Sequence, residues 1–337
     1  MQAQHLSEAR NDDRIYRNAA VIRRYGDPSV FQIEKIDLPQ IKPDQMLVKA
    51  YATSVNPIEW KMRKGTLKLL TGNKFPLILG FDVSGEVVEV GSQVTRFKPG
   101  DLIYACLDQP IGGAYSEYVG VSEKVAALKP LNMTHEQAAA VPLAAMTALQ
   151  ALRNQGQIKA GQRVLVNGAS GGVGTFAIQI AKILGASEVT GVCSGINLER
   201  VKSLGADRVI DYTQQDFTQQ EFTLDQAKYD LVFDVVGSRS LSDCKPVLQP
   251  WGRYVTTQPY PNNYFQSFLT SLLPGQRYKV ILLKTNSVDL VYLTDQIEAG
   301  KIQSVVDRTY SLSEIAEAHA YSETERAVGK IVIAIED

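Results

Sequence analysis

Hydrophobic and polar residues follow two different patterns along the chain. Between residue 19 and about residue 141, apolar residues occur in short alternating or continuous runs separated by turn sequences, which is typical of a β-rich, barrel-like domain. The clearest runs are LVKAYATSV (47–55), DVSGEVVEV (82–90), YSEYVGV (115–121) and KVAALK (124–129). Residues 134–156 are then rich in Ala and Leu, with apolar residues at helical spacing up to Gly156, and predict a helix at the boundary to a second domain.

Strands and helices alternate in this second domain, which predicts a doubly wound parallel sheet of the α/β class. Strands are expected at 162–170, 188–194, 207–212, 229–237 and 252–258, and helices at 172–184 and 197–206. After residue 284 the pattern predicts amphipathic helices at 288–302 and 311–323 and a final strand at 329–336. We expect this last part to return to the first domain, where a terminal strand would close an exposed sheet edge.

The predicted division of the chain has three parts. Residues 1–18 are too polar to pack and are expected to be a flexible tail or linker. Residues 19–142 and 285–337 form the barrel-like domain, and residues 143–284 form the α/β domain. Within the latter, segment 259–280 is rich in aromatic and apolar residues but bounded by Pro and Gly, which indicates a substrate loop or a dimer interface.

Composition and charge narrow the function classes. The 35 Lys and Arg residues nearly balance the 36 Asp and Glu residues and form no basic run, so nothing indicates nucleic-acid binding or a membrane surface, and a small-molecule partner is favoured. The three cysteines lie far apart, and no Cys/His cluster has metal-ligand spacing. The chain contains neither a signal-peptide pattern nor about 18 consecutive apolar residues, so a cytoplasmic location is expected.

Glycines concentrate between a predicted strand and a predicted helix, in the segment NGASGGVG (167–174). A strand that runs through such a turn into a helix would present free backbone N–H groups and the helix dipole to a diphosphate. The same residues satisfy the G-x-S-x-G of a hydrolase, with Ser170 as nucleophile, but that reaction needs an acid and then a histidine downstream. Only His319 lies downstream, in a helical segment assigned to the other domain. The turn therefore favours dinucleotide binding.

The end of the second strand of the α/β domain indicates which dinucleotide is bound. NAD enzymes place a carboxylate there, about 20 residues beyond the glycine turn. This chain has Ser194 and Asn197 there, followed by Arg200 and Lys202, which leave room and positive charge for a 2′-phosphate. NADP(H) is therefore favoured; the alternative, plausible for either cation alone, is that it belongs to the solvated face of the next helix.

Several motifs together resemble the zinc-independent branch of the medium-chain dehydrogenases/reductases, the quinone oxidoreductase (ζ-crystallin-like) and enoyl reductase group. They are GFDVSGEVVEVG (80–91), FKPGDLIYA (97–105), VLVNGASGGVG (164–174), SLGADRVIDY (203–212), YDLVFDVVG (229–237) and GKIVIAI (329–335). The resemblance covers residues 19–335 and implies a GroES-like barrel domain, a Rossmann domain and an active site in the cleft between them. Zinc-dependent members have G-H-E where this chain has Gly80-Phe81-Asp82, so the resemblance implies no metal. Because alcohol oxidation relies on a Lewis acid to activate the alkoxide, reduction of a polarised C=C bond or a quinone is favoured instead.

The resemblance also implies roles for individual residues in cofactor binding. Asn56 and Thr147 would lie near the nicotinamide half, and Glu59 stands where the family usually has Asp. The remaining assignments are Gly171, Gly172 and Val173 at the pyrophosphate, Ser194, Asn197 and Tyr212 around the 2′-phosphate, and Val236 and Gly237 on the adenosine side. Arg326 would reach the 2′-phosphate as a C-terminal basic residue does in some members, or is a surface arginine.

The reaction expected from this resemblance is hydride transfer from NADPH to the β-carbon of a quinone, enone or enoyl thioester, which requires the two carbons to approach to roughly 3 to 3.5 Å. Tyr115, Tyr51 and Lys61 are the candidate donors to the oxygen on which negative charge develops, although a barrel tyrosine is more often a core residue. Two alternatives stay open. One is the enoyl reductase domain of a polyketide synthase, with an acyl carrier protein as partner; the other is an NADPH-binding protein with little turnover. A homodimer is compatible with each of them.

Overall fold

The computed structural model describes residues 10–11, 14–219 and 228–335. Backbone contacts divide the chain into two units. The barrel unit comprises residues 1–143, 285–298 and 306–337, and the α/β unit comprises residues 144–284 and 299–305.

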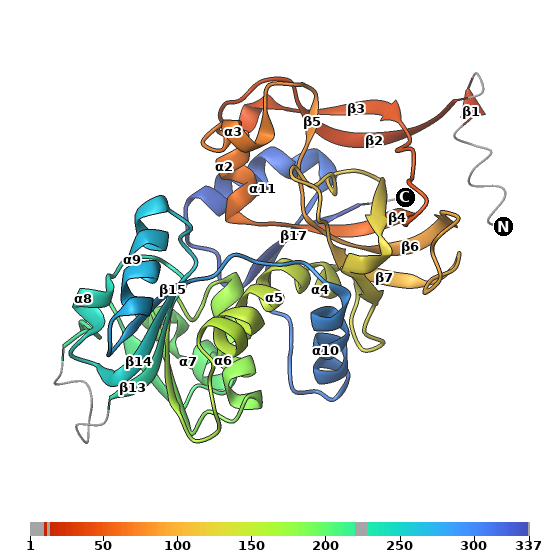
Figure 1. Ribbon diagram of the computed structural model, residues 1–337. Helices are drawn as coiled ribbons and strands as arrows, with labels where there is room; N and C mark the ends of the chain where they lie inside the picture. The colour runs from red at the N-terminus through yellow and green to blue at the C-terminus, as the bar shows by residue number, and fades with distance from the viewer. Residues whose placement is uncertain (1–9, 12–13, 220–227, 336–337) are drawn as a thin grey trace. The chain divides into compact units, whose positions relative to one another are not determined.

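The barrel unit is built on two β-sheets (Figure 1). The larger sheet has the order β16-β17-β4-β6-β7-β9, with β8 paired to β4, and encloses an apolar core of mainly Val, Ala, Ile and Leu residues. Its strands are β4 (Gln45–Val55), β6 (Asp82–Val90), β7 (Leu102–Cys106), β8 (Tyr118–Ser122), β9 (Ala126–Leu128), β16 (Val306–Ser311) and β17 (Lys330–Ala334). The smaller sheet consists of β1 (Arg10–Asn11), β2 (Arg14–Ile22), β3 (Phe31–Asp37) and β5 (Leu77–Ile78).

Short helices complete the barrel unit. They are α2 (Pro57–Arg63), α3 (Lys68–Thr71), α4 (His135–Ala139), α10 (Ser287–Glu298) and α11 (Ile315–Glu323). Helix α2 begins with a capping box, in which Asn56 and Glu59 satisfy each other's backbone N–H groups, and with Pro57 in its first turn, where a missing N–H costs nothing.

Three details of the barrel unit differ from the predictions. Residues 14–18 were expected in a flexible tail, but they form the first half of β2, in which residues 14–15 pair with β1 and residues 16–18 pair with β3; residues 1–9 and 12–13 lie outside the described ranges. Strand β17 does not close a sheet edge, because it lies between β16 and β4. The edge belongs to β16, whose polar sequence VDRTYS lacks the apolar alternation by which strands are recognised.

The α/β unit contains a six-stranded, entirely parallel sheet, as predicted. Its order, β12-β11-β10-β13-β14-β15, is that of a doubly wound sheet, in which the chain starts at the centre and moves outward to both edges (Figure 1). The strands are β10 (Arg163–Asn167), β11 (Glu188–Cys193), β12 (Arg208–Asp211), β13 (Tyr229–Asp234), β14 (Leu248–Thr256) and β15 (Arg277–Val280). The helices are α5 (Pro142–Gln150, whose first two residues belong to the barrel unit), α6 (Gly172–Ile183), α7 (Leu198–Ser203), α8 (Leu241–Cys244) and α9 (Pro261–Leu272).

The helix predicted at 134–156 is divided into α4, α5 and a π-helical turn at Ala151–Gln155. The break precedes Pro142, which has no N–H to continue α4 and instead starts α5. Segment 259–280, predicted to be a substrate loop or a dimer interface, forms α9 and the edge strand β15, so it is not a loop; its role in a dimer interface stays a prediction. Residues 299–305 were expected in the barrel domain, but Gln303 N donates to Gln179 Oε1 of α6 at 2.8 Å, which holds this segment in the α/β unit.

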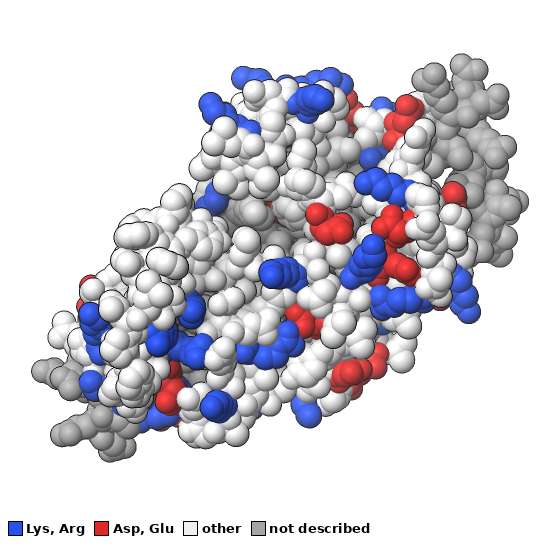
Figure 2. All heavy atoms as spheres, viewed as in Figure 1, with Lys and Arg blue, Asp and Glu red and all other residues white. Residues whose placement is uncertain are grey.

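Charged side chains of both signs are scattered over the face shown in Figure 2, and the surface where Figure 1 places α9 is largely uncharged. Within the described ranges, no helix combines the length and the hydrophobicity needed to cross a bilayer.

Candidate active site

The glycine turn joins β10 to α6 at the carboxyl edge of the parallel sheet. Gly168 has φ of +85°, which favours glycine, and a Cβ atom on Gly174 would lie 2.0 Å from the carbonyl oxygen of Gly168. In contrast, a Cβ atom on Gly171 would meet only that oxygen, at 3.5 Å, so open space lies beside this residue. The first-turn N–H groups of α6 have no acceptor within the helix. These features fit a cradle for the diphosphate of a dinucleotide.

The neighbouring strand ends bring three predicted residues together. Asn197 Nδ2 donates to Ser194 Oγ at 3.1 Å just beyond β11, and Tyr212 N, just beyond β12, donates to Cys193 O at 3.1 Å. The structure adds Asp211, which sequence reasoning missed because it searched for a carboxylate only at the end of the second strand. Thr213 donates twice to Asp211, and a Cβ atom on Gly195 would lie 2.6 Å from its Oδ2. Hydrogen bonds from Thr213 lower the pKa of Asp211, so a carboxylate lies beside the Ser194 turn.

Val236 and Gly237 follow β13 and border the glycine turn. A Cβ atom on Gly168 would lie 2.7 Å from Val236 Cγ2. Asp234 orders this loop, because its Oδ1 accepts from the backbone N–H groups of Val236 (3.1 Å) and Gly237 (2.8 Å). Asn167 Nδ2 also donates to Asp234 Oδ1 at 2.9 Å, which ties the loop to the end of β10.

The other predicted cofactor ligands belong partly to the α/β unit and partly to the barrel unit. Arg200 is exposed on α7, and Thr147, on α5, is 8% exposed. Asn56 and Arg326 belong to the barrel unit, and Arg326 follows α11.

Asn56 lies in a buried cluster of charged and polar side chains in the barrel unit. Its Nδ2 donates to Asp82 Oδ2 at 2.9 Å and to Glu59 Oε1 at 3.1 Å, and its Oδ1 accepts from Lys330 Nζ. Asp82 Oδ1 accepts from Leu143 N at 2.7 Å, while its Oδ2 lies 3.5 Å from Lys330 Nζ. The Asn56 amide is therefore held by internal partners on both sides, which suits a positioning role better than direct donation to a ligand.

A second chain of hydrogen bonds connects Glu59 to α11. Tyr115 Oη donates to Glu59 Oε2 at 2.5 Å, His319 Nε2 lies 3.0 Å from Tyr115 Oη, and Arg63 Nε donates to His319 Nδ1 at 3.4 Å. Because an arginine only donates, His319 Nδ1 accepts, and the histidine proton lies on Nε2 and points to Tyr115. Arg63 itself pairs with Glu323, so the chain runs from the molecular surface to Glu59.

Burial sets the protonation states along this chain. It raises the pKa of Glu59 to about 7, against the lowering effect of the hydrogen bonds from Tyr115 and Asn56, and it raises the pKa of Tyr115 well above its usual value. Burial and the charge of Arg63 hold the pKa of His319 well below its usual value, so this histidine is neutral. With both its nitrogens committed inside the barrel unit, His319 is not the histidine of a Ser170 triad.

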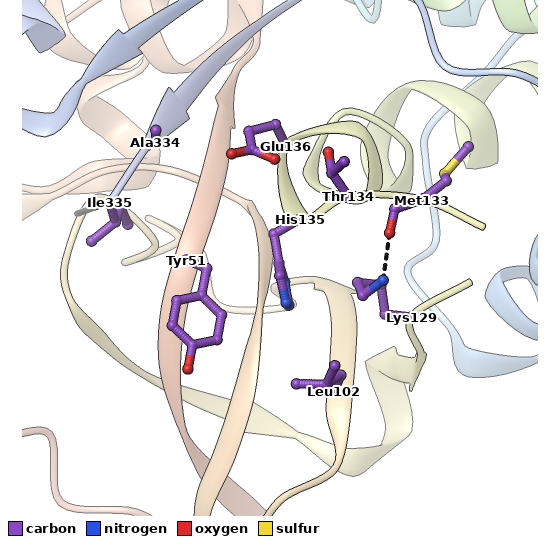
Figure 3. A pocket seen from close by; sticks show the side chains of 9 residues that line it. All are labelled: Tyr51, Leu102, Lys129, Met133, Thr134, His135, Glu136, Ala334 and Ile335. Atoms are coloured by element: carbon purple, nitrogen blue, oxygen red, sulfur yellow. Dashed lines mark hydrogen bonds between the residues drawn. The ribbon is translucent and has the colours of Figure 1, made fainter. Parts of the chain in front are cut away.

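Tyr51 borders a hollow of about 630 Å³ on the barrel unit (Figure 3). Its hydroxyl donates to Glu86 Oε2 at 3.0 Å, and its ring lies edge-on to the His135 ring, 4.7 Å between centroids. Lys61 is partly exposed on α2, with Nζ 5.4 Å from the centre of the Trp60 ring. The three candidate donors therefore lie in three different surroundings: Tyr115 in the core, Tyr51 at the hollow and Lys61 on α2.

Comparison with known proteins identifies the family. Residues 42–131 match the family profile described as alcohol dehydrogenase GroES-like domain, and residues 204–333 match the profile described as zinc-binding dehydrogenase. The chain is 36% identical over 305 residues to the chloroplast envelope quinone oxidoreductase homolog of Arabidopsis thaliana, covering 89% of this chain and 92% of that protein. This chain belongs to the quinone oxidoreductase group of the medium-chain dehydrogenases/reductases.

Two further relatives agree with this assignment. The NADPH-dependent alkenal/one oxidoreductase, chloroplastic, of Arabidopsis thaliana is 37% identical over 325 residues, covering 94% of this chain and 78% of that protein. The structure of the quinone oxidoreductase from Coxiella burnetii superposes with a TM-score of 0.85 at 31% identity, covering 95% of this chain and all of that chain. The predicted family and the fold class, a Rossmann-like parallel sheet with a GroES-like domain, are confirmed. Both Arabidopsis names refer to the chloroplast, so the cytoplasmic location stays a prediction.

One matching profile is described as zinc-binding, which raises the question of whether this chain has residues that could ligate zinc. Phe81 stands where zinc-dependent members of the superfamily have the histidine of G-H-E, and a phenyl ring does not ligate a metal. Across 10–11, 14–219 and 228–335, no group of three or more His, Cys, Asp or Glu side chains is placed to hold a metal ion. The residues of this chain that the structure describes therefore do not fit a zinc site.

The position of Tyr115 changes its expected role. Its side chain is fully buried, and its hydroxyl contacts both Glu59 and His319. We expect Tyr115→Phe to lower the free energy of unfolding by about 2 kcal/mol, because a buried carboxylate loses a donor and the His319 Nε2–H loses its acceptor. Reductase turnover should change by less than about twofold, since the hydroxyl cannot reach a substrate from the core.

The matched control is Tyr104→Phe, another fully buried tyrosine whose hydroxyl donates to the uncharged Leu290 carbonyl at 2.8 Å. Its loss should cost about 1 kcal/mol. Urea unfolding and steady-state kinetics of both variants check this prediction. A Tyr115→Phe variant with unchanged stability and a large loss of kcat would restore Tyr115 as a catalytic residue.

Proposed function

We propose that this protein is an NADPH-dependent oxidoreductase that reduces the activated C=C bond of an enone or enoyl thioester, or a quinone, without a catalytic metal. The glycine turn carries the proposal: Gly168 and Gly174 bring backbone N–H groups to the carboxyl edge of a doubly wound sheet, where dinucleotides bind. The names of the relatives, a quinone oxidoreductase homolog and an NADPH-dependent alkenal/one oxidoreductase, support the reaction type.

Each group of residues contributes a separate function to this chemistry. The turn from Gly171 to Val173 would bind the diphosphate, and the Val236–Gly237 loop, held by Asp234, would border the adenosine half. When bound, the nicotinamide supplies a hydride to the β-carbon, and a proton completes the reduction. Lys61, which is partly exposed and cationic, is the donor that we favour for the developing negative charge on the substrate oxygen, because Tyr115 is buried.

A preference for NADPH over NADH is part of this proposal. Ser194 and Asn197 form a hydrogen-bonded pair beside Tyr212, and neither carries the negative charge that would repel a 2′-phosphate. Asp211 disfavours the 2′-phosphate of NADPH, because its negatively charged carboxylate lies beside Gly195. We therefore expect a moderate preference that an added cation would strengthen.

The test follows NADPH absorbance while the purified protein meets, in turn, an o-quinone, a short enone, an enoyl thioester and a saturated aldehyde, with NADH as parallel cofactor. Consumption with one of the first three substrates but not with the aldehyde is the expected result. Tight NADPH binding without consumption of any substrate would contradict the proposal and favour a binding role.

Asn197→Arg tests the proposed cofactor preference separately. A guanidinium beside Ser194 should raise the ratio of kcat/KM for NADPH to that for NADH by about tenfold, through charge-assisted hydrogen bonds to the 2′-phosphate. Ser203→Arg, which adds the same charge at the other end of α7, is the control and should leave the ratio unchanged. An equal effect of both substitutions would mean that Asn197 does not face the 2′-phosphate.

A further inference from the structure

Residues 60–81 of the barrel unit contain no Asp or Glu, although the whole chain has a formal net charge of −1. The cations of this segment are Lys61, Arg63, Lys64, Lys68 and Lys74. Apolar and small residues separate most of them in the sequence, so they do not form a basic run. The structure nevertheless gathers several of them around the short helix α3.

Tyr25 holds the parts of this surface together. Its ring packs edge-on against Phe75, with 5.1 Å between the ring centroids, and its hydroxyl lies 2.5 Å from Thr71 Oγ1 and donates to Gly72 O. A Cβ atom on Gly65 would lie 2.9 Å from Tyr25 Cγ, so the chain passes directly over the tyrosine ring at this point. These contacts join the turn between β2 and β3 to both ends of the segment that contains α3.

Exposed cations flank these contacts. Arg24, Lys64 and Lys74 each directly precede a residue that touches or belongs to the Tyr25 cluster, and the carbonyl oxygen of Lys68 accepts from Gly72 N at 2.8 Å. All four of these side chains belong to exposed residues. Figure 2 shows Lys and Arg side chains at the end of the barrel unit where Figure 1 places α3.

Nearby acidic side chains offset only part of this charge. Glu323 pairs with Arg63, which is fully buried, and lies 2.6 Å from Lys64 Nζ. Hydrogen bonds from Ser29, together with the charges of Arg24 and Arg63, lower the pKa of Asp27, so this residue is a second carboxylate in the neighbourhood. These two carboxylates face Arg63 and the four exposed cations, so a net positive charge remains.

Two leucines lie between Lys68 and Lys74 on this surface. Leu69 is 100% exposed and Leu70 is 59% exposed, and both belong to α3. The helix is fixed in place by Thr71, which is 5% exposed and contacts Tyr25. Isolated exposed leucines are ordinary, but adjacent ones surrounded by cations form a surface that gains free energy where an apolar layer lies beneath an anionic one.

From this combination we propose that the α3 surface, consisting of Arg24, Lys64, Lys68, Leu69, Leu70 and Lys74, attaches the protein to a membrane that contains anionic lipids. The cations would face the lipid headgroups, and the leucines would enter the boundary between headgroups and acyl chains. Long lysine side chains reach headgroups while neighbouring apolar residues lie deeper. The attachment is peripheral, because a helix of four residues is far too short to span a bilayer.

Other partners fit the α3 surface less well. A nucleic acid would attract the cations, but the phosphates that dominate such binding offer no apolar layer for Leu69 and Leu70. A second copy of the chain in a two-fold contact would place the same cations opposite one another, which is unfavourable. An acidic protein would satisfy the charge and remains an outcome of the experiment.

The first experiment sediments the purified full chain with vesicles of phosphatidylcholine alone and with vesicles that also contain phosphatidylglycerol. Binding is expected to the second kind only and should weaken in about 0.5 M salt. Lys68→Gln/Lys74→Gln should lower the partition coefficient about 25-fold, or about fivefold for each cation near an anionic surface. Lys98→Gln/Lys301→Gln is the matched control, since it removes the same charge from exposed positions elsewhere and should change binding less than about twofold.

A second experiment tests whether the leucines enter the membrane. The cysteines Cys106, Cys193 and Cys244 are all buried, so Leu69→Cys can be labelled selectively with an environment-sensitive dye. The dye emission should shift to shorter wavelength with the anionic vesicles. Leu131→Cys is the control, because Leu131 is 90% exposed on the same unit and its dye should keep the emission that it has in water.

Several results would overturn the inference. They are absence of binding to the anionic vesicles, equal binding to both kinds of vesicle, and an equal loss of binding in the two glutamine double variants. The inference is also wrong if the lysine variant loses binding while the dye at position 69 keeps its emission, because the surface would then recognise negative charge alone, as on an acidic protein or a nucleic acid. Thermal unfolding verifies that each variant is folded, and Lys74→Gln alone, with an expected fivefold loss, serves if the double variant is not.

Discussion

Replacing Lys330 with Met is expected to lower the free energy of unfolding of the barrel unit by about 3 to 5 kcal/mol. Lys330 is 4% exposed and lies 3.5 Å from the fully buried carboxylate of Asp82. Its Nζ also donates to Asn56 Oδ1. Methionine fills a similar volume but leaves Asp82 buried without its counter-charge, and an uncompensated buried charge is costly.

Urea unfolding measures this effect in a Trp251→Phe background, in which Trp60 alone reports on the barrel unit. The double variant Asp82→Asn/Lys330→Met should lose less stability than the sum of the two single variants, because it removes both charges together. Lys124→Met is the control: Lys124 is exposed, lies 3.7 Å from Asp44 and should contribute less than about 1 kcal/mol. A Lys330→Met variant no less stable than this control would show that the buried pair does not stabilise the fold.

Gly174→Ala is expected to raise the dissociation constant for NADPH by at least about 100-fold, a loss of about 3 kcal/mol in binding free energy. The new Cβ atom would lie 2.0 Å from Gly168 O and 2.8 Å from Ala169 Cα. Both are backbone atoms that cannot rotate away, so the turn has to open and its N–H groups lose their convergence on the diphosphate. Fluorescence titration with NADPH measures the affinity.

Gly171→Ala is the matched control in the same turn. Gly171 has φ of −82°, and its Cβ atom would meet nothing closer than Gly168 O at 3.5 Å, so alanine fits the fold. Stability should be unchanged, while NADPH affinity should fall about tenfold if the diphosphate passes over this residue. Wild-type affinity in Gly174→Ala would show that the turn does not bind the cofactor.

Much of the fold could be predicted because its signals are local. The strand-turn-helix around Gly168–Gly174 and the βα alternation that follows depend on periodicity and glycine spacing over a few residues, and α6 was expected within one residue of its observed end. Features that depend on distant residues were not predictable in this way. Strand β16 is defined by pairing with β17 rather than by its own pattern. Helix α9 and strand β15 formed in a segment whose bounding Pro and Gly had indicated a substrate loop or a dimer interface.

The same contrast between local signals and contacts of distant residues applies to the candidate site. Ser194 and Asn197 are three residues apart, and their hydrogen bond follows from the turn after β11. Asp211 was missed, although the motif VIDY contains it, because its approach to Gly195 depends on the pairing of β11 with β12. Tyr115 was proposed as a substrate donor because sequence does not reveal burial; in the structure its hydroxyl lies between Glu59 and His319.

The sequence by itself determined the α/β class, the doubly wound unit, the glycine turn and the family, since these are encoded in short-range patterns and contiguous motifs. Only the tertiary structure decided which side chains share a buried cluster and which cations share a surface. Asn56 and Lys330, 274 positions apart, meet because β17 pairs with β4, and Arg24 and Lys74 share the α3 surface because Tyr25 packs against Phe75. Such contacts arise from the global fold, because burial and charge pairing depend on which segments the completed sheets bring together.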